Sequence, residues 1–229
     1  MPRSARVAPG GLAYHVMNHA VGNTQLFRKE ADYEAFQQVL IEACRRKPMR
    51  ILSYCMLPDR WHLVVYPRKD GQLTDFVRWI THTHAVRHRA AHKTIGFGHI
   101  YQGRFKNFIV QRDESLTSLR GYVERLALSE RLVRRAEKWR WSSLWARLNG
   151  PDELKDVLEP CPMPRPAAWT DRVNRPIEDL ELARIQTSVM RGRPYGDDRW
   201  VAQTTARLGL EHTIRPQGRP RKNPVSKKK

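Results

Sequence analysis

The amino-acid pattern predicts an α+β protein with a ferredoxin-like βαββαβ sheet, followed by one further long helix. Two short apolar stretches joined by a Pro-Asp pair predict a central hairpin. Stretches with helical spacing of apolar residues lie on either side of that hairpin along the chain. The resulting order of elements is that of the split βαβ motif. A chain of 229 residues, 40% of them hydrophobic, is long enough for one such domain with extensions.

The first half of the chain supplies a strand, a helix and the hairpin. Residues 13–21 (AYHVMNHAV) alternate well enough for a strand, and Gly22 with Asn23 follows as a turn signal. Residues 31–47 place apolar side chains three or four apart and end in cations, so they predict an amphipathic helix with Asp32 as its N-cap. Residues 50–58 and 61–67 predict two strands joined by the turn at Pro58 and Asp59.

The second half of the domain repeats the pattern of helix and strand. Residues 71–92 predict a helix rich in His and Arg, and residues 105–111 (FKNFIVQ) predict a further strand. Residues 113–136 predict a long helix that Asp113 caps. Its apolar stripe consists of Leu116, Leu119, Val123 and Leu126.

The chain divides into three parts by composition. We expect a domain at residues 10–148, a Pro-rich, loop-rich connector at 149–190, and a basic C-terminal extension at 191–229. Within the extension, residues 197–213 predict a short helix, and the sequence Gly-Arg-Pro occurs on both sides of it. Gly-Arg-Pro with basic neighbours can lie in a narrow minor groove of DNA, or it can form basic loops that contact phosphate.

Charge is the most unusual property of the composition. Lys and Arg number 42 and Asp and Glu number 23, which gives a net charge of +19 and an isoelectric point near 10.5. Such an excess indicates nucleic acid as the first partner and an anionic membrane surface as the second. No apolar run approaches the roughly 20 residues of a membrane span, and the N-terminus has no apolar signal region. We therefore expect a nucleic-acid partner, no membrane and no obligatory protein partner.

The three cysteines, Cys44, Cys55 and Cys161, are widely spaced. This spacing fits a reducing compartment and excludes a CxxC-type zinc site. Together with the charge, it predicts a cytoplasmic, nucleoid-associated protein.

Two positions on the hairpin and one on the long helix are candidate functional residues. Arg60 and His62 are two apart, so their side chains share one face of the strand. His62 is either a satisfied structural histidine or a metal ligand, whereas arginine stays protonated and cannot ligate a metal. Tyr122 is either an aromatic residue at the margin of the apolar stripe or a nucleophile that attacks a phosphodiester.

The histidines at 82, 84, 88 and 92 have helical spacing and could form a metal cluster. Because Arg87, Arg89 and Lys93 lie among them, we instead expect this helix side to be solvated and to face phosphate.

Together these stretches resemble the REP-associated tyrosine transposases, a branch of the single-tyrosine, HUH-type insertion-sequence transposases. The resemblance covers nearly the whole chain. It rests on YHVMNHAVGNTQLF (14–27), YCMLPDRWHLVVYP (54–67), GHIYQGRFKNFIVQ (98–111), GYVERLALSERLV (121–133), WRWSSL (139–144) and RGRPYG with ARLGLEHTIRPQGRPRK near the C-terminus.

The resemblance implies a ferredoxin-like catalytic domain that acts on single-stranded DNA folded into hairpins, typically repetitive extragenic palindromes. It further implies a divalent ion, Mg²⁺ or Mn²⁺, held by a His-hydrophobic-His strand, and a helix tyrosine that forms a 5′-phosphotyrosine. By position Tyr122 matches the nucleophile and His62 matches the second histidine. The predicted DNA-binding residues are Arg60, Arg104, Lys106, Arg191, Arg193, Arg219, Arg221 and Lys222.

This chain departs from the family pattern at two metal-side positions. Arg60 stands where the first histidine is expected, and Leu126 stands where the family has an asparagine one turn after the tyrosine. A single imidazole holds Mg²⁺ poorly, because that ion prefers oxygen ligands. Two functions therefore remain open: a DNA strand transferase and a disarmed descendant that only binds DNA. An RNA-binding protein is a third alternative, which the pattern of residues 105–111 favours less.

Overall fold

The computed structural model describes residues 7–158 and 165–215. Its first part contains four strands and three long helices in the predicted order. These are β1 (Ala13–His19), α1 (Glu30–Arg46), β2 (Arg50–Leu57), β3 (Arg60–Tyr66), α2 (Gln72–Ala91), β4 (Lys106–Val110) and α3 (Glu114–Ser129).

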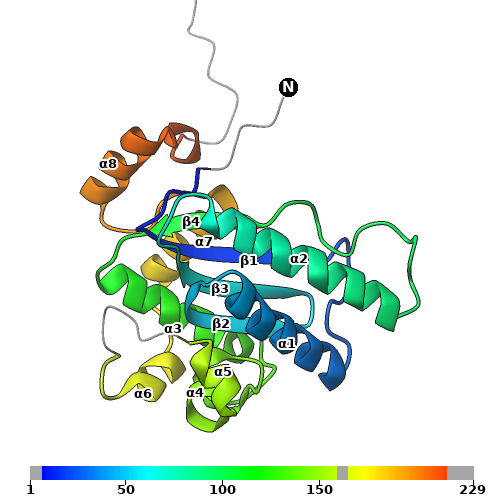
Figure 1. Cartoon of the computed structure of the whole chain (residues 1–229). Helices are drawn as coiled ribbons and strands as arrows, with labels where there is room; N and C mark the ends of the chain where they lie inside the picture. The colour runs from blue at the N-terminus through cyan, green and yellow to red at the C-terminus, as the bar shows by residue number, and fades with distance from the viewer. Residues whose placement is uncertain (1–6, 159–164, 216–229) are drawn as a thin grey trace, which may run out of the picture.

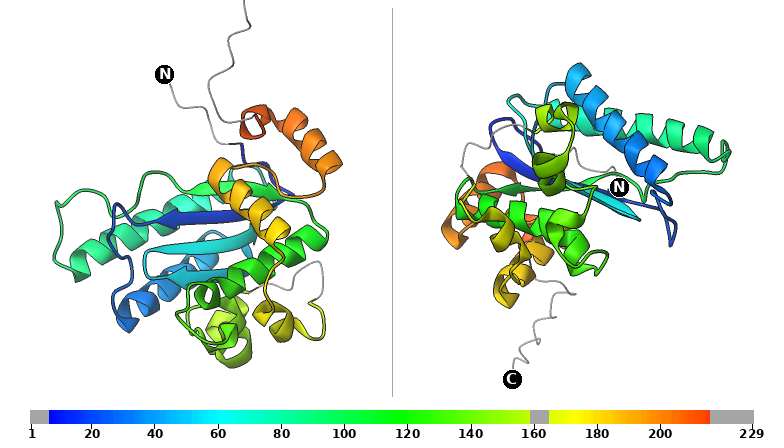
Figure 2. Two further views of the ribbon diagram at one scale, coloured as in Figure 1. Left: turned by 180° about the vertical axis from the view of Figure 1, so that it is seen from behind. Right: turned by 90° about the horizontal axis from the view of Figure 1, so that it is seen from below.

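The four strands form one sheet in the order β2-β3-β1-β4, and every neighbouring pair is antiparallel. This is the ferredoxin-like topology, so the predicted fold class is confirmed. Helices α1 and α2 cover one face of the sheet, and α3 and α7 (Asp179–Arg191) lie on the other (Figures 1 and 2).

Each face of the sheet has its own hydrophobic core. On the α1 and α2 side, Tyr14, Val16 and Trp61 are fully buried with the apolar residues of both helices. On the α3 side, Val64 and Phe108 pack with the predicted stripe of α3. Because strand side chains alternate, this pattern assigns every residue of β1, β3 and β4 to one of the two faces.

The ends of two helices refine the predictions. Asp113 is the N-cap of α3, as predicted, and its carboxylate accepts a hydrogen bond from the Ser115 amide at 2.8 Å. The helix ends at Ser129, earlier than the predicted 136. Asp32 is not the N-cap of α1; it lies inside the first turn, where its carboxylate accepts from the amides of Arg28 and Lys29. An acidic residue there still satisfies free amides at the helix N-terminus.

The segment predicted as a loop-rich connector contains helices, and in this respect the prediction was wrong. The described elements after α3 are η1 (Ala136–Lys138), α4 (Ser143–Asn149), α5 (Asp152–Asp156), α6 (Trp169–Asn174), α7 (Asp179–Arg191), α8 (Asp198–Leu208) and η2 (Glu211–Thr213). Helix α6 packs on α3 through Trp169 and Val173, which are buried. Among the described prolines of this segment, Pro151, Pro166 and Pro176 lie outside the helices, where they do not interrupt a helical hydrogen bond.

Helix α3 is joined to this second layer by a buried carboxylate. Glu124 is fully buried and accepts hydrogen bonds from the Ser143 hydroxyl at 2.5 Å, from Arg165 at 2.5 Å and from the Trp169 indole at 2.7 Å. A buried charge is stable only when it is paired in this way. The contact fixes the face that α3 turns toward the sheet.

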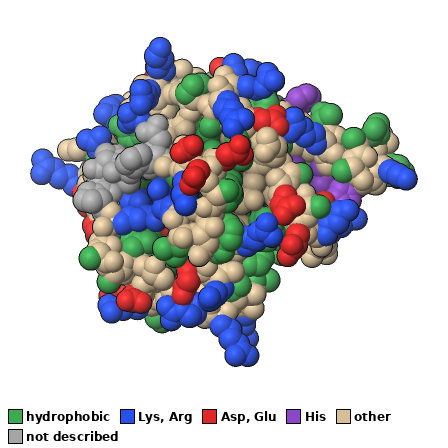
Figure 3. All heavy atoms as spheres, turned by 60° about the horizontal axis from the view of Figure 1, so that its bottom comes forward, with side chains coloured by type: hydrophobic (Ala, Val, Ile, Leu, Met, Phe, Trp, Pro, Cys, Tyr) green, Lys and Arg blue, Asp and Glu red, His purple; other side chains and the backbone are tan. Residues whose placement is uncertain are grey.

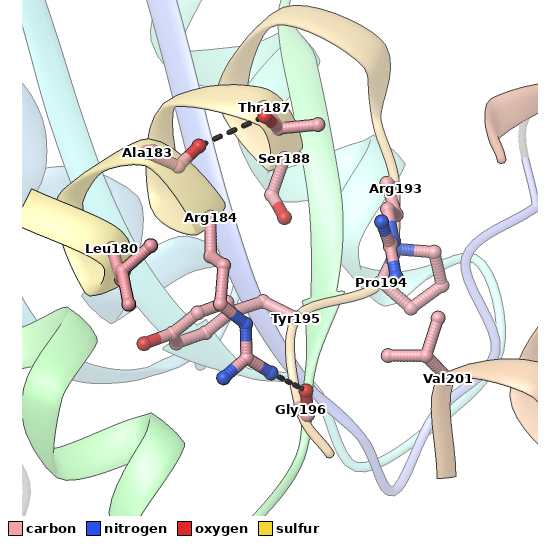
Figure 4. A pocket seen from close by; sticks show the side chains of 10 residues that line it. All are labelled: Leu180, Ala183, Arg184, Thr187, Ser188, Arg193, Pro194, Tyr195, Gly196 and Val201. Atoms are coloured by element: carbon pink, nitrogen blue, oxygen red, sulfur yellow. Dashed lines mark hydrogen bonds between the residues drawn. The ribbon is translucent and has the colours of Figure 1, made fainter. Parts of the chain in front are cut away.

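The C-terminal extension completes the β4 edge of the sheet. Tyr195 pairs with Val110 of β4 as a short parallel bridge, and its buried ring joins the core on the α3 side. Figure 4 shows Tyr195 beside Arg184, whose guanidinium donates to the Gly196 carbonyl next to a cavity of about 200 Å³. Residues 192–196 therefore belong to the folded domain and cover an edge strand.

Candidate functional site

The face of β3 that carries the candidate residues lies under α3. Val64 belongs to the core beneath α3, whereas Trp61 and Leu63 belong to the opposite core. By alternation, Arg60 and His62 point to the α3 side, as predicted. In the register of the sheet, His19 of β1 lies opposite Arg60, and Met17 of β1 lies opposite both His62 and Lys106. Lys106 is therefore on the same face as His62.

His62 forms a pair with a histidine from the neighbouring strand. Its Nδ1 lies 2.9 Å from Nε2 of His15 on β1, so one ring donates to the other. Both residues are buried, at 2% and 0% exposure. Burial, His15 and the Arg60 charge hold the pKa of His62 well below its usual value. Burial lowers the pKa of His15 to about 3, so both rings are neutral at pH 7.

Tyr122 lies on α3 at the margin of the core that contains Val64 and Leu126, and it is partly buried. Burial raises the pKa of its phenol, and the nearby Arg60 guanidinium acts in the opposite direction. A positive charge beside a phenol stabilises the phenolate, which is the nucleophilic form. The fold thus brings the helix tyrosine to the side of the sheet that holds Arg60 and His62.

Arg60 is held by two carboxylates. Its Nη1 donates to Asp59 Oδ1 at 2.7 Å, and its Nη2 forms an ion pair with Oε1 of Glu130, the residue that follows α3. The exposed fraction of the side chain is 24% for Arg60 and 32% for Glu130. The pair therefore links the start of β3 to the end of the helix that carries Tyr122, at a place that solvent reaches.

Leu126 is a core residue. It is 5% exposed and packs among the apolar residues between α3 and the sheet. One turn after Tyr122, the chain thus presents a hydrocarbon side chain that has no donor or acceptor atom.

The residues around Tyr122 do not fit a divalent metal ion. His62 offers one further nitrogen, Nε2, which is buried and has no hydrogen-bond partner among the described residues. Arg60 and Leu126 supply no ligand, and a fixed positive charge repels a cation. Within residues 7–158 and 165–215, no group of three or more His, Cys, Asp or Glu side chains could hold a metal ion. Mg²⁺ and Mn²⁺ prefer several oxygen ligands, and the carboxylates of Asp59 and Glu130 near this face are already paired with Arg60.

The predicted DNA-binding cations fall into separate groups. Arg104 and Arg191 line a common cavity of about 300 Å³, together with His212. Arg193 lies 3.7 Å from Asp198. Arg219, Arg221 and Lys222 lie outside the described residues. Lys and Arg side chains are also spread over the face in Figure 3, with acidic side chains between them.

Three of the four predicted solvated histidines differ from the prediction, whereas His82 is exposed as expected. His84 is 3% exposed rather than solvated, and its Nδ1 lies 2.6 Å from the Tyr101 hydroxyl. His88 and His92 stack at 4.2 Å between ring centroids, and His92 Nε2 lies 2.9 Å from Asp32 Oδ1. These side chains join α2 to neighbouring elements, so they are not free to face phosphate. Helical spacing could not show that α1 covers the side of the helix on which these three residues lie.

Two residues of the site were not predicted. His15 could be assigned to a face from the alternation of β1, but the strand pairing that brings it to His62 is a long-range contact. Glu130 fell inside the predicted long helix, where nothing in the sequence marks it as a partner of Arg60. The helix ends just before it, and Arg131 has a positive φ of 59°.

This fold and this face define a class: ferredoxin-like proteins in which a helix with a tyrosine covers a sheet face that carries histidine and basic side chains. The family model described as "Transposase IS200 like" matches residues 10–126. The chain belongs to the IS200-like transposase family, which confirms the resemblance predicted from the sequence. Transposases of this kind are metal-dependent.

Comparison with one solved structure supports the fold. A REP-associated tyrosine transposase bound to a REP hairpin matches with a TM-score of 0.54 and 17% identity, over 78% of this chain and all of the other. A protein assigned as a transposase from Deinococcus radiodurans R1 matches with a TM-score of 0.39 and 16% identity, over 54% of this chain and 96% of the other. A comparison with curated proteins gave no significant match. None of the described helices has the length and apolar character needed to cross a membrane.

Proposed function

We propose that this protein binds single-stranded DNA folded into hairpins, and that Tyr122 attacks a phosphodiester of that DNA. The observation that carries the proposal is the position of Tyr122 on α3, at the margin of the core on the same side of the sheet as Arg60 and Lys106. A net charge of +19 supports a polyanionic partner. The REP hairpin in the similar solved structure suggests the form of the DNA.

The proposed step is a transesterification. The phenolic oxygen of Tyr122 forms a bond to phosphorus, and the bond between phosphorus and the 3′ oxygen breaks. The phenol loses its proton, and the departing 3′ oxygen gains one. The products are a 5′-phosphotyrosine and a free 3′-hydroxyl. The energy of the broken ester bond is kept in the new one, so a second strand can later reverse the step.

In the family a divalent ion would polarise the phosphate and orient it for attack. In this chain the candidate ligand is His62, and Mg²⁺ or Mn²⁺ is the metal that the family implies. The side chains present do not fit that ion, for the reasons given above. We therefore assign to the residues of this chain only what they can do themselves. Tyr122 supplies the oxygen, and Arg60 and Lys106 supply positive charge on the same side of the sheet.

The replacements at positions 60 and 126 favour a second function, in which the protein binds hairpin DNA without cleaving it. Leu126 packs in the core, at the position where the family has an asparagine on the side of the metal. Both functions predict hairpin binding that weakens with salt, because Lys and Arg displace counterions from the DNA. Only a covalent product separates them.

A nicking assay on hairpin single strands, with Mn²⁺ or with EDTA, tests the proposal. We expect a covalent protein–DNA adduct from the wild type and none from Tyr122→Phe, which preserves the ring but removes the attacking oxygen. An adduct that persists in Tyr122→Phe contradicts the assigned nucleophile. Adduct formation only by Arg60→His combined with Leu126→Asn supports the binding-only function. If neither a covalent adduct nor hairpin binding is observed, both proposed functions are contradicted.

A further inference from the structure

The ion pair of Arg60 points to a phosphate site that works without a metal ion. We propose that Arg60 is itself the phosphodiester ligand beside Tyr122, and that Glu130 competes with the phosphate for its guanidinium. This inference rests on the proposed function. It goes further by naming the group that binds the scissile phosphate and the carboxylate that opposes it.

The geometry of Arg60 suits a phosphate. A guanidinium offers five N–H donors in a planar fork that matches two oxygens of a carboxylate or of a phosphate. In the free protein that fork is occupied by Asp59 and Glu130. Glu130 is one third exposed, so it can move away into solvent. A phosphate oxygen that takes its place then keeps the charge-assisted hydrogen bond of Nη2.

The position of Glu130 places that phosphate on the side of the sheet that α3 and Tyr122 cover. Glu130 follows α3 directly, and its amide donates to the Leu126 carbonyl at 3.0 Å, so its backbone is fixed by the helix. The Arg60 charge reaches the Tyr122 phenol on the same helix. A phosphate bound to Arg60 therefore lies on the face of the sheet that Tyr122 borders.

The chemistry of phosphoryl transfer explains why a guanidinium can bind the phosphate here in place of a metal ion. Positive charge aimed at a phosphate stabilises the negative charge of phosphoryl transfer, and arginine supplies it in many phosphoryl-transfer sites. Here it is supplied from β3, one residue before the buried Trp61, so its backbone is rigid. The nitrogen of His62 that faces His15 is already in a hydrogen bond, and Leu126 offers no ligand.

The test compares two substitutions that change the net charge by the same amount. Glu130→Gln releases Arg60, and Glu42→Gln releases Arg87, which Glu42 holds through two contacts of 2.8 Å on the other side of the sheet. Both variants raise the net charge by one. In EDTA, we expect Glu130→Gln to bind hairpin DNA about threefold more tightly than Glu42→Gln, as loss of a partly exposed competing ion pair implies. Adding Arg60→Ala should remove this difference.

Equal affinities of the two variants would contradict the inference while leaving hairpin binding itself intact. Loss of wild-type binding in EDTA that Mn²⁺ restores would also contradict the inference but not the proposed function. A second readout does not depend on hairpin recognition. Phenylglyoxal modifies accessible arginines, and peptide mass spectrometry can follow its reaction at Arg60. A short single-stranded oligonucleotide in EDTA should slow that labelling, and more strongly in Glu130→Gln. Labelling of Arg60 that the oligonucleotide leaves unchanged in both proteins would overturn the proposal.

Discussion

Arg60, the first residue of β3, forms an ion pair with Glu130, the residue that follows α3. The pair connects the sheet to the far end of the helix that carries Tyr122. Its second contact, to Asp59 in the hairpin turn, keeps the guanidinium at the start of β3. The charge of Arg60 thus stays near the phenol, where it opposes the effect of burial on the pKa of Tyr122.

The first prediction concerns the buried carboxylate that joins α3 to α4 and α6. Replacing Glu124 with Gln should lower the free energy of unfolding by about 3 kcal/mol, because Arg165 loses its charged partner inside the protein. Urea denaturation measures the change. Glu114→Gln is the matched control on the same helix, since Glu114 is exposed and pairs with Arg172 at the surface; it should cost less than 1 kcal/mol. Equal losses would mean that Glu124 is not a structural anchor.

The second prediction concerns Leu126. Restoring the family asparagine should destabilise the protein by about 3 kcal/mol, because an amide then occupies an apolar core. Leu126→Met keeps the volume and should cost less than about 1.5 kcal/mol. Thermal unfolding of the two variants tests this. If Leu126→Asn were as stable as wild type, the side chain would have an unrecognised polar partner.

The third prediction concerns pH. Burial keeps His15, His62 and His84 neutral, with the pKa of His15 and of His84 lowered to about 3. Their pKa values are lower in the folded than in the unfolded chain, so the unfolded chain binds more protons below about pH 6.5. Stability is therefore complete above that pH and falls as the pH drops toward 3, by about 1.4 kcal/mol per pH unit for each histidine.

Two variants test this assignment in urea titrations between pH 4 and 7. His84→Phe should reduce the pH slope of the free energy of unfolding by about 1.4 kcal/mol per unit. His82→Ala, at an exposed position of the same helix, should leave the slope unchanged. A slope that does not respond to His84→Phe would show that this histidine is not the titrating group.

The fourth prediction separates the two parts of the C-terminal extension. Deleting residues 216–229 removes six Lys and Arg residues, so DNA affinity should fall and its dependence on salt should weaken, with the melting temperature unchanged. Deleting residues 191–229 also removes Tyr195 and Val201, which are buried, and should lower the melting temperature. Unchanged DNA affinity after the shorter deletion would exclude the terminal cations from the interface.

The structure corrects one expectation from sequence, which concerns the C-terminal extension. Gly-Arg-Pro at 192–194 was expected to lie in a basic extension outside the domain at residues 10–148. In the structure Gly192 ends α7 with a φ of 70°, and Tyr195 pairs with β4. Local composition does not reveal such pairing, because it depends on a strand some 85 residues earlier in the chain. The role of Arg193 toward DNA stays a prediction.

Periodicity predicted the sheet, its helices and the shared face of Arg60 and His62, since these follow from local spacing. Asp113 was found for the same reason, because an N-cap acts within one turn. The helices α6 and α7 were missed because prolines around them resemble a loop. The His15–His62 pair, the Glu124 contacts and the Arg60–Glu130 pair join distant parts of the chain, and a single sequence carries no local signal for them.

The most direct measurement of the central claim identifies the residue that carries DNA after the reaction. Wild-type protein is incubated with hairpin single strands, any adduct is trimmed with nuclease, and tryptic peptides are analysed by tandem mass spectrometry. The account predicts a nucleotide 5′-phosphate on Tyr122, also in EDTA. A nucleotide on another residue, or no adduct from either the wild type or Arg60→His combined with Leu126→Asn, would contradict it.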